Sequence, residues 1–244
     1  MIVGLLHPGA MGSALGAVLR ERGHDVVWAS AGRSDATRTR AGAAGLRDVG
    51  SVEALTAEAE LVVSICPPHA ALDVARPVRD HRGLYLDANA VSPGTARRIA
   101  ALHPRFVDGG IVGPPPHRRG TTRLYLSGDE APAVAALFEG SLVEARLTVD
   151  ASALKMTYAA WSKGSGALLL AIRAVARAYG VEDVLEREWR ESVPELPELL
   201  AAAERSAAAK AWRWAGEMDE IAMTFAAVDQ PDGFHRAAAA VYRS

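Results

Sequence analysis

Cysteine is almost absent from this chain of 244 residues, which contains only Cys66. One cysteine excludes an intrachain disulfide and any cysteine-rich metal site. The seven histidines show neither HxxxH nor HxH spacing, the spacings that bring two imidazoles to one metal ion. We therefore expect no structural metal.

A strong charge of one sign and long apolar runs are also lacking. The formal net charge is −2, so no overall basic field would draw the chain to nucleic acid or to a membrane surface. No apolar run approaches the ~18 residues of a membrane span. The first apolar run has no basic start and ends at His7, which indicates a strand rather than a signal peptide. These absences favour a cytoplasmic protein.

What the chain does contain is enough apolar material for a core, since 50% of its residues are hydrophobic. In the first 150 residues, short apolar runs alternate with helical patterns at Ala10–Arg22, at Arg33–Ala41 and from near Pro93. The alternation predicts βαβ units, a mainly parallel doubly wound sheet and helices on both faces. The predicted strands are Ile2–Leu6, Asp25–Ala29, Leu61–Cys66, Leu84–Asp87, Phe106–Val112, Arg123–Ser127 and a weaker candidate at 145–148.

The pattern changes near Asp150, and residues 151–244 contain no convincing strand. We therefore predict an α/β domain over 1–150, followed by a long interdomain helix and an all-α domain over 151–244. The long helix spans Asp150–Tyr179 and allows a bend at Gly164–Gly166. Further predicted helices are Glu182–Glu191, Pro197–Arg205, Ala207–Val228 and Asp232–Tyr242, with proline near the breaks between them.

A glycine motif follows the first predicted strand directly. The turn comprises His7, Pro8, Gly9, Ala10, Met11 and Gly12. The dinucleotide-binding fingerprint is G-x-G-x-x-G at a strand-to-helix turn, where backbone N–H groups face a pyrophosphate. Gly9 and Gly12 match its second and third glycines, and His7 replaces the first. A dinucleotide-binding loop is favoured over an ordinary βα turn.

The end of the second predicted strand indicates which dinucleotide binds. NAD sites usually place Asp or Glu there to hold the ribose hydroxyls. This chain has Ser30, Arg33 and Ser34 instead, and such a cluster would hold the 2′-phosphate of NADP by charge-assisted hydrogen bonds. The alternative is a solvated helix start.

A second segment is expected near the nicotinamide end of the ligand. Cys66, Pro67 and Pro68 follow the third predicted strand at the carboxyl edge of the sheet, where that end usually lies. Cys66 itself is interpreted as a small buried residue rather than a reactive thiol.

Four segments together resemble the β-hydroxyacid dehydrogenase superfamily, which includes 3-hydroxyisobutyrate and 6-phosphogluconate dehydrogenases. They are Gly4–Gly12, Leu86–Pro93, Phe106–Gly113 and Ala153–Tyr158. Their order and spacing agree with the family along most of the first 180 residues. The tail from Ala211 to Arg236 resembles a short helical domain of unknown function found on some members of the superfamily.

The resemblance implies roles for individual residues. Lys155 would be the catalytic acid/base, against the alternative of a solvated helix lysine, and Asn89 would lie beside the nicotinamide. Helical spacing independently aligns Lys155 with the small residues Ser152, Ala159, Ser162 and Gly166. That stripe either leaves room for a ligand or lets another helix pack closely. The implied substrate-contacting positions are Ser92, Gly110, Val112, Gly113, Tyr158, Ala159 and Ser162.

Two positions depart from the family pattern. Ala159 stands where the family usually has asparagine, and Val112 stands where it usually has serine. Both are polar substrate contacts in the family, so their loss weakens the assignment to hydroxyacids. Ser92, Ser162, Tyr158 and Lys163 are candidates to compensate.

The resemblance leads to an NADP-dependent oxidoreductase acting on a small carbonyl or hydroxyacid, with NADP preferred over NAD. An imine reductase on the same scaffold is one alternative, and a non-catalytic NADP-binding sensor is another. Family members generally dimerise with the active site near the subunit interface, so we expect a homodimer. The tryptophans of the helical half fit a helix core or that interface.

Overall fold

The computed structural model describes all 244 residues. The chain forms two compact units, Met1–Lys155 and Met156–Ser244. The boundary falls inside a single helix, α7 (Ala151–Ala178). No helix in the chain combines the length and the apolar character needed to cross a membrane.

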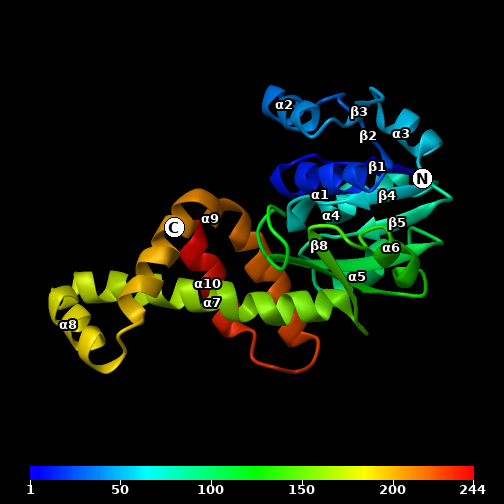
Figure 1. Ribbon diagram of the computed structural model, residues 1–244. Helices are drawn as coiled ribbons and strands as arrows, with labels where there is room; N and C mark the ends of the chain where they lie inside the picture. The colour runs from blue at the N-terminus through cyan, green and yellow to red at the C-terminus, as the bar shows by residue number, and fades with distance from the viewer. The chain divides into compact units, whose positions relative to one another are not determined.

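The first unit is built on one eight-stranded sheet in the order β3-β2-β1-β4-β5-β6-β7-β8 (Figure 1). Strands β1 to β6 pair in parallel in the order 3-2-1-4-5-6, the arrangement of dinucleotide-binding domains. β7 is antiparallel to β6, and β8 is parallel to β7. The bounds are β1 (Ile2–Leu5), β2 (Asp25–Trp28), β3 (Arg47–Asp48), β4 (Leu61–Ser64), β5 (Leu84–Asp87), β6 (Phe106–Val112), β7 (Thr122–Ser127) and β8 (Val143–Leu147).

Helices cover both faces of this sheet, which confirms the predicted doubly wound α/β architecture. One face packs against α1 (Ala10–Glu21), α2 (Asp35–Ala43) and α6 (Ala131–Ala136). The other packs against α3 (Val52–Glu58), α4 (Ala71–Ala75) and α5 (Pro93–Ala100).

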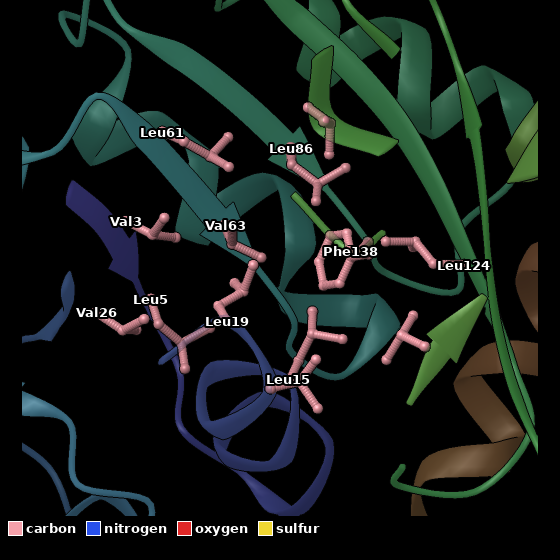
Figure 2. Packing of buried hydrophobic residues seen from close by; sticks show 14 of the residues in the cluster. Val3, Leu5, Leu15, Leu19, Val26, Leu61, Val63, Leu86, Leu124 and Phe138 are labelled. Atoms are coloured by element: carbon pink, nitrogen blue, oxygen red, sulfur yellow. The ribbon is translucent and has the colours of Figure 1, made fainter. Parts of the chain in front are cut away.

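Each central strand places alternate side chains on the two faces, as the two-residue period of a strand requires. Figure 2 shows Leu15 and Leu19 of α1 pointing toward side chains of the sheet that include Val3 and Leu5. Gly4, which lies between Val3 and Leu5 in β1, faces the opposite side of the sheet, where an added Cβ would lie 2.4 Å from Leu55 of α3. The core therefore lies in two layers, one on each side of the sheet.

The second unit contains the rest of α7 with α8 (Glu182–Ser192), α9 (Leu196–Ala226) and α10 (Gly233–Arg243). Leu169, Trp189 and Leu200 form a buried cluster contributed by α7, α8 and α9. The structure confirms one long helix after residue 150 and an all-α C-terminal half. The prediction of separate helices at Pro197–Arg205 and Ala207–Val228 is wrong, because α9 runs through both. Ser206 interrupts the pattern, but the alanines on either side are the strongest helix formers and carry the helix across it.

The far end of the small-residue stripe on α7 is used for helix packing. A Cβ at Gly166 would lie 3.2 Å from the Tyr242 hydroxyl and 3.6 Å from Ala203. The Tyr242 hydroxyl donates a hydrogen bond to the Lys163 carbonyl oxygen at 2.7 Å. Lys163 Nζ in turn lies 2.8 Å from Glu217 Oε1, an ion pair within this unit. The backbone carbonyl and the side-chain ammonium group of Lys163 are thus both bonded within the second unit.

Candidate active site

The predicted cofactor residues gather at one edge of the first unit's sheet. β1 pairs in parallel with β2 and β4, and β4 pairs in parallel with β5, so the segments after their carboxyl ends meet along one edge. His7 follows β1, Ser30 follows β2, Cys66 follows β4 and Asn89 follows β5.

The two glycines of the loop have different surroundings. A Cβ at Gly12 would lie 2.3 Å from the His7 carbonyl oxygen, whereas a Cβ at Gly9 would meet nothing within 4 Å. Gly12 is therefore required for close packing of α1 on the turn, and Gly9 borders open space. Gly9 is the N-cap of α1, which has no side-chain cap and no acidic residue in its first turn. Such a helix start attracts an anion, because its N–H groups and the helix dipole both favour negative charge.

His7, which replaces the first glycine, is a neutral side chain beside a cation. Burial and then the positive charge of Arg33 lower the pKa of His7 to about 4. Arg33 donates a hydrogen bond to the Leu6 carbonyl oxygen at 3.2 Å, so its guanidinium lies at the end of β1 beside the loop. Burial lowers the pKa of Arg33, but an arginine keeps its charge in proteins. The structure thus brings together the predicted phosphate loop and one predicted 2′-phosphate ligand.

Ser30 and Ser34 make contacts that the sequence did not reveal. The Ser30 N–H donates to Asp48 Oδ1 at 3.2 Å. Burial tends to raise the pKa of Asp48, but hydrogen bonds from Ser30 and Gly50 outweigh it and hold that pKa below its usual value. Ser34 is the N-cap of α2, and its hydroxyl accepts from the Thr37 N–H at 3.4 Å.

Asp48 is therefore a charged group that sequence reasoning missed. It ends β3, a two-residue strand with exposed polar side chains that carries no hydrophobic signal. Its carboxylate lies beside Ser30, although residues 29–34, which follow β2 directly, include no Asp or Glu, and Asp35 comes only at the start of α2. Any 2′-phosphate at this edge would have to bind near both Arg33 and this carboxylate.

The segment after β4 is tied to the end of β5. The Cys66 N–H donates to Asn89 Oδ1 at 2.5 Å. Burial and then the charge of Asp87 raise the pKa of the Cys66 thiol to about 12, so the thiol stays protonated at neutral pH. This agrees with the interpretation of Cys66 as an unreactive side chain, although the residue is only partly buried.

Lys155 is positioned by a set of hydrogen bonds at the start of α7. The Asp108 carboxylate, on β6, accepts from the Ser152 N–H at 2.8 Å and from the Ser152 hydroxyl at 2.6 Å. The Ser127 hydroxyl donates to the same carboxylate at 3.2 Å and accepts from the Ala151 N–H at 3.0 Å. These bonds hold the first turn of α7 against β6 and β7. Asp108 and Ser127 are positioning residues that sequence reasoning did not identify.

Gly110 allows α7 to lie this close to β6. A Cβ there would be 2.8 Å from the Ala151 carbonyl oxygen and 2.9 Å from the Lys155 Cβ. Gly110 lies two residues beyond Asp108, which pairs with Asp87, the last residue of β5. Lys155 therefore lies over the part of β6 that extends past β5, toward the carboxyl edge. The structure brings the predicted acid/base and the predicted glycine together.

The other predicted substrate residues have varied surroundings. Ser92 is buried as the N-cap of α5, where its hydroxyl accepts from the Thr95 N–H at 3.2 Å. Val112 is also buried, at the end of β6, and Gly113 begins the exposed loop that follows. Tyr158 and Ser162, both exposed, and the buried Ala159 lie further along α7 in the second unit. Their contacts to a substrate stay predictions.

Replacing the two loop glycines by alanine should separate their roles. Gly12→Ala should lower the free energy of unfolding by about 1–3 kcal/mol, because the new methyl group overlaps the His7 carbonyl and α1 must shift. Gly9→Ala should change it by no more than about 1 kcal/mol, because its site is open and its backbone is extended. Urea unfolding followed by circular dichroism measures both, and equal losses would contradict the assignment.

His7 should make the protein less stable in acid. The unfolded chain takes up a proton near pH 6.5, whereas folded His7 resists it until about pH 4, so the free energy of unfolding falls as the pH drops through this window. Between pH 7 and pH 5, His7→Asn should lose less stability than the unmodified protein. His69→Asn, at an exposed position, is the control and should leave the dependence unchanged. Similar slopes in both variants would show that His7 is not responsible.

Comparisons with known proteins agree with this architecture. Residues 176–244 match the family described as "Domain of unknown function (DUF1932)". An uncharacterised 28.5 kDa protein of Methanothermus fervidus is 28% identical over 191 residues, which cover 76% of this chain and 74% of that protein.

Two solved structures extend the comparison to the full chain. One is a conserved protein of unknown function, described as structurally similar to 3-hydroxyacid dehydrogenases. It is 31% identical, with a TM-score of 0.72 over 100% of this chain and 96% of that chain. The second is a 3-hydroxyisobutyrate dehydrogenase from Mycobacterium tuberculosis. It is 17% identical, shares the fold with a TM-score of 0.72, and is matched over 99% of this chain and 92% of that chain. The full-length match at 31% identity, together with the helical tail, shows that this chain belongs to the β-hydroxyacid dehydrogenase-like family, among members with a helical C-terminal domain.

Proposed function

We propose that this protein is an oxidoreductase that binds NADP and uses Lys155 as the acid/base on a small carbonyl or hydroxyacid substrate. The observation that carries the proposal is that Lys155 and the glycine loop belong to the same carboxyl edge of one sheet. The carboxyl edge of such a sheet is where ligands bind in this class of fold. Family membership supports a dehydrogenase or reductase.

The residues of this edge fit a dinucleotide. The start of α1 offers uncapped N–H groups to a pyrophosphate, and Gly9 leaves the space beside them open. Arg33 offers a cation at the end of β1, next to the same loop. When bound, the nicotinamide supplies or accepts a hydride. Lys155 would hold the proton that the substrate oxygen gains on reduction and would take it back in the reverse direction.

The preference for NADP depends on two opposing charges. Arg33 and the hydroxyls near α2 favour a 2′-phosphate, whereas the Asp48 carboxylate beside Ser30 disfavours it. We favour NADP because a guanidinium binds phosphate by charge-assisted hydrogen bonds, although the Asp48 carboxylate, which the bonds from Ser30 and the Gly50 N–H keep ionised, reduces that preference.

Arg33→Ala should weaken NADPH binding about tenfold or more, which is the value of one charge-assisted hydrogen bond. The affinity for NADH should change by less than about twofold, because NADH lacks the 2′-phosphate. Titration of each cofactor by fluorescence measures both constants, with Arg97→Ala, at an exposed position on α5, as the control. Equal losses for the two cofactors would contradict the phosphate role. If the unmodified protein binds neither at millimolar concentration, the proposed function is wrong.

Lys155→Met should reduce turnover by about 100-fold or more, the usual contribution of a general acid/base. Cofactor affinity should stay nearly unchanged, because Lys155 is assigned to the substrate. NADPH oxidation with a panel of small aldehydes and ketones gives the rate. The matched control is Lys210→Met, since Lys210 is exposed in the second unit. Undiminished turnover in Lys155→Met would remove this residue from the mechanism.

An imine reductase remains the second candidate, because Ala159 replaces the family asparagine and its side chain offers no hydrogen bond to a substrate oxygen. Adding cyclic imines to the same panel distinguishes the two activities. A non-catalytic NADP-binding sensor would bind the cofactor and turn over neither class.

The homodimer also stays a proposal. Several large apolar side chains of the second unit are exposed, including Trp161 at 77% and Phe234 at 79%. They border an apolar cavity of about 670 Å³ formed by α7, α9 and α10. Exposed apolar patches of this kind often mark protein–protein interfaces, and a second copy of the chain would cover this one.

A further inference from the structure

A buried polar cluster lies directly beneath the segment Cys66–Pro68. Its members, Ser64, Asp87 and Asn89, are exposed by 0%, 1% and 2%. Ser64 and Asp87 are paired neighbours at the ends of β4 and β5. A carboxyl group buried this deeply is costly to keep and needs compensating hydrogen bonds, so the position of Asp87 calls for an explanation beyond packing.

Asn89 links this cluster to the segment above it. Its backbone N–H donates to Asp87 Oδ1 at 3.0 Å, and its side-chain Nδ2 donates to the same oxygen. Nδ2 also donates to the Ser64 hydroxyl at 3.0 Å. On the other side, Asn89 Oδ1 accepts from the Cys66 N–H. Both polar groups of the Asn89 side chain are thus bonded within the protein.

The Asp87 carboxylate determines which way the Asn89 amide points. Asp87 Oδ1 accepts from both the Asn89 N–H and Nδ2, so the amide turns Nδ2 toward Asp87 and leaves Oδ1 for the Cys66 N–H. An amide in place of Asp87 has both a donor and an acceptor, and it would permit the reversed orientation of Asn89. The reversed amide would present N–H groups to the Cys66 N–H and lose that bond.

Fixing the Cys66 backbone fixes more than one residue. Pro67 and Pro68 follow immediately, and each proline ring holds its own φ angle near −65°. The Pro67 φ is −59°, and Pro68 begins the short 3-10 turn Pro68–Ala70. A hydrogen bond at Cys66 therefore sets the course of a stiff segment at the edge where the nicotinamide is proposed to bind.

We propose that Asp87 is a positioning residue for the nicotinamide end of the site, acting through the Asn89 amide on the backbone of Cys66–Pro68. The proposal rests on the proposed cofactor function. In this proposal, Asn89 contributes to cofactor binding by fixing the backbone of Cys66–Pro68. The proposal also gives a role to Asp87, whose buried carboxyl group the acid/base mechanism does not use.

The experiment compares a whole cofactor with its adenosine half. NADPH and 2′,5′-ADP are each titrated against the full-length chain and against Asp87→Asn, and the fluorescence of bound NADPH is recorded. We expect the dissociation constant for NADPH to rise up to about tenfold in Asp87→Asn, the upper value for the loss of one hydrogen bond, because the Cys66 N–H bond to Asn89 no longer fixes the segment beside the nicotinamide. The constant for 2′,5′-ADP should stay within about twofold of the unmodified value, because that ligand has no nicotinamide.

Two further variants keep the test decisive. Asn89→Ala removes the link itself and should show the same split, so it decides the question if Asp87→Asn does not fold. Leu124→Ala removes a buried side chain from the core of the same unit and so destabilises it. This variant should not weaken the binding of NADPH more than the binding of 2′,5′-ADP. Equal weakening of both ligands, or no change in either, would overturn the positioning role. If the unmodified protein binds NADPH and these variants show no split, only this inference fails. If it binds no NADPH at all, the proposed function fails with it.

Discussion

The placement of Lys155 depends on the bond between the Asp108 carboxylate and the first turn of α7. The carboxylate takes two hydrogen bonds from Ser152 and one from Ser127. Burial raises the pKa of Asp108, and the bonds from Ser152 oppose that rise. With the helix start held there, Gly110 needs to be glycine, and Lys155 follows one turn later. The hydrogen bonds between the Asp108 carboxylate and the first turn of α7 thus determine where Lys155, three residues after Ser152, is placed.

The elements of this architecture that the sequence predicts are those determined by residues close together in the chain. The glycine loop is recognisable because Gly12 has a steric requirement that few residues meet, and the strands other than β3 carry alternating or continuous apolar runs. The short helices α3, α4 and α6 have at most seven residues, too few turns for a hydrophobic period to emerge. The sequence predicts two helices in place of α9 because Ser206 breaks the local pattern, whereas the helix propensity of the neighbouring alanines keeps the helix continuous.

The contacts that the sequence did not reveal are those that join distant segments. Asp48 and Ser30 are 18 residues apart, and their contact requires β3, which has no apolar signal of its own. Asp108 and Ser152 are 44 residues apart, and no pattern in either segment predicts that the two residues are in contact. In the same way, the charge balance around the proposed 2′-phosphate site could not be judged from the β2 end alone, because half of it comes from the neighbouring strand.

The unit boundary within α7 has a consequence for how firmly Lys155 is held. A helix forms and melts cooperatively, since each turn depends on the hydrogen bonds of the next. Lys155 is the last residue of the first unit, and Met156 begins the second, yet both belong to one ladder of backbone bonds. Unfolding of the helical half would therefore remove the backbone bonds that continue α7 beyond Lys155, and the proposed acid/base would be held by the first turn alone.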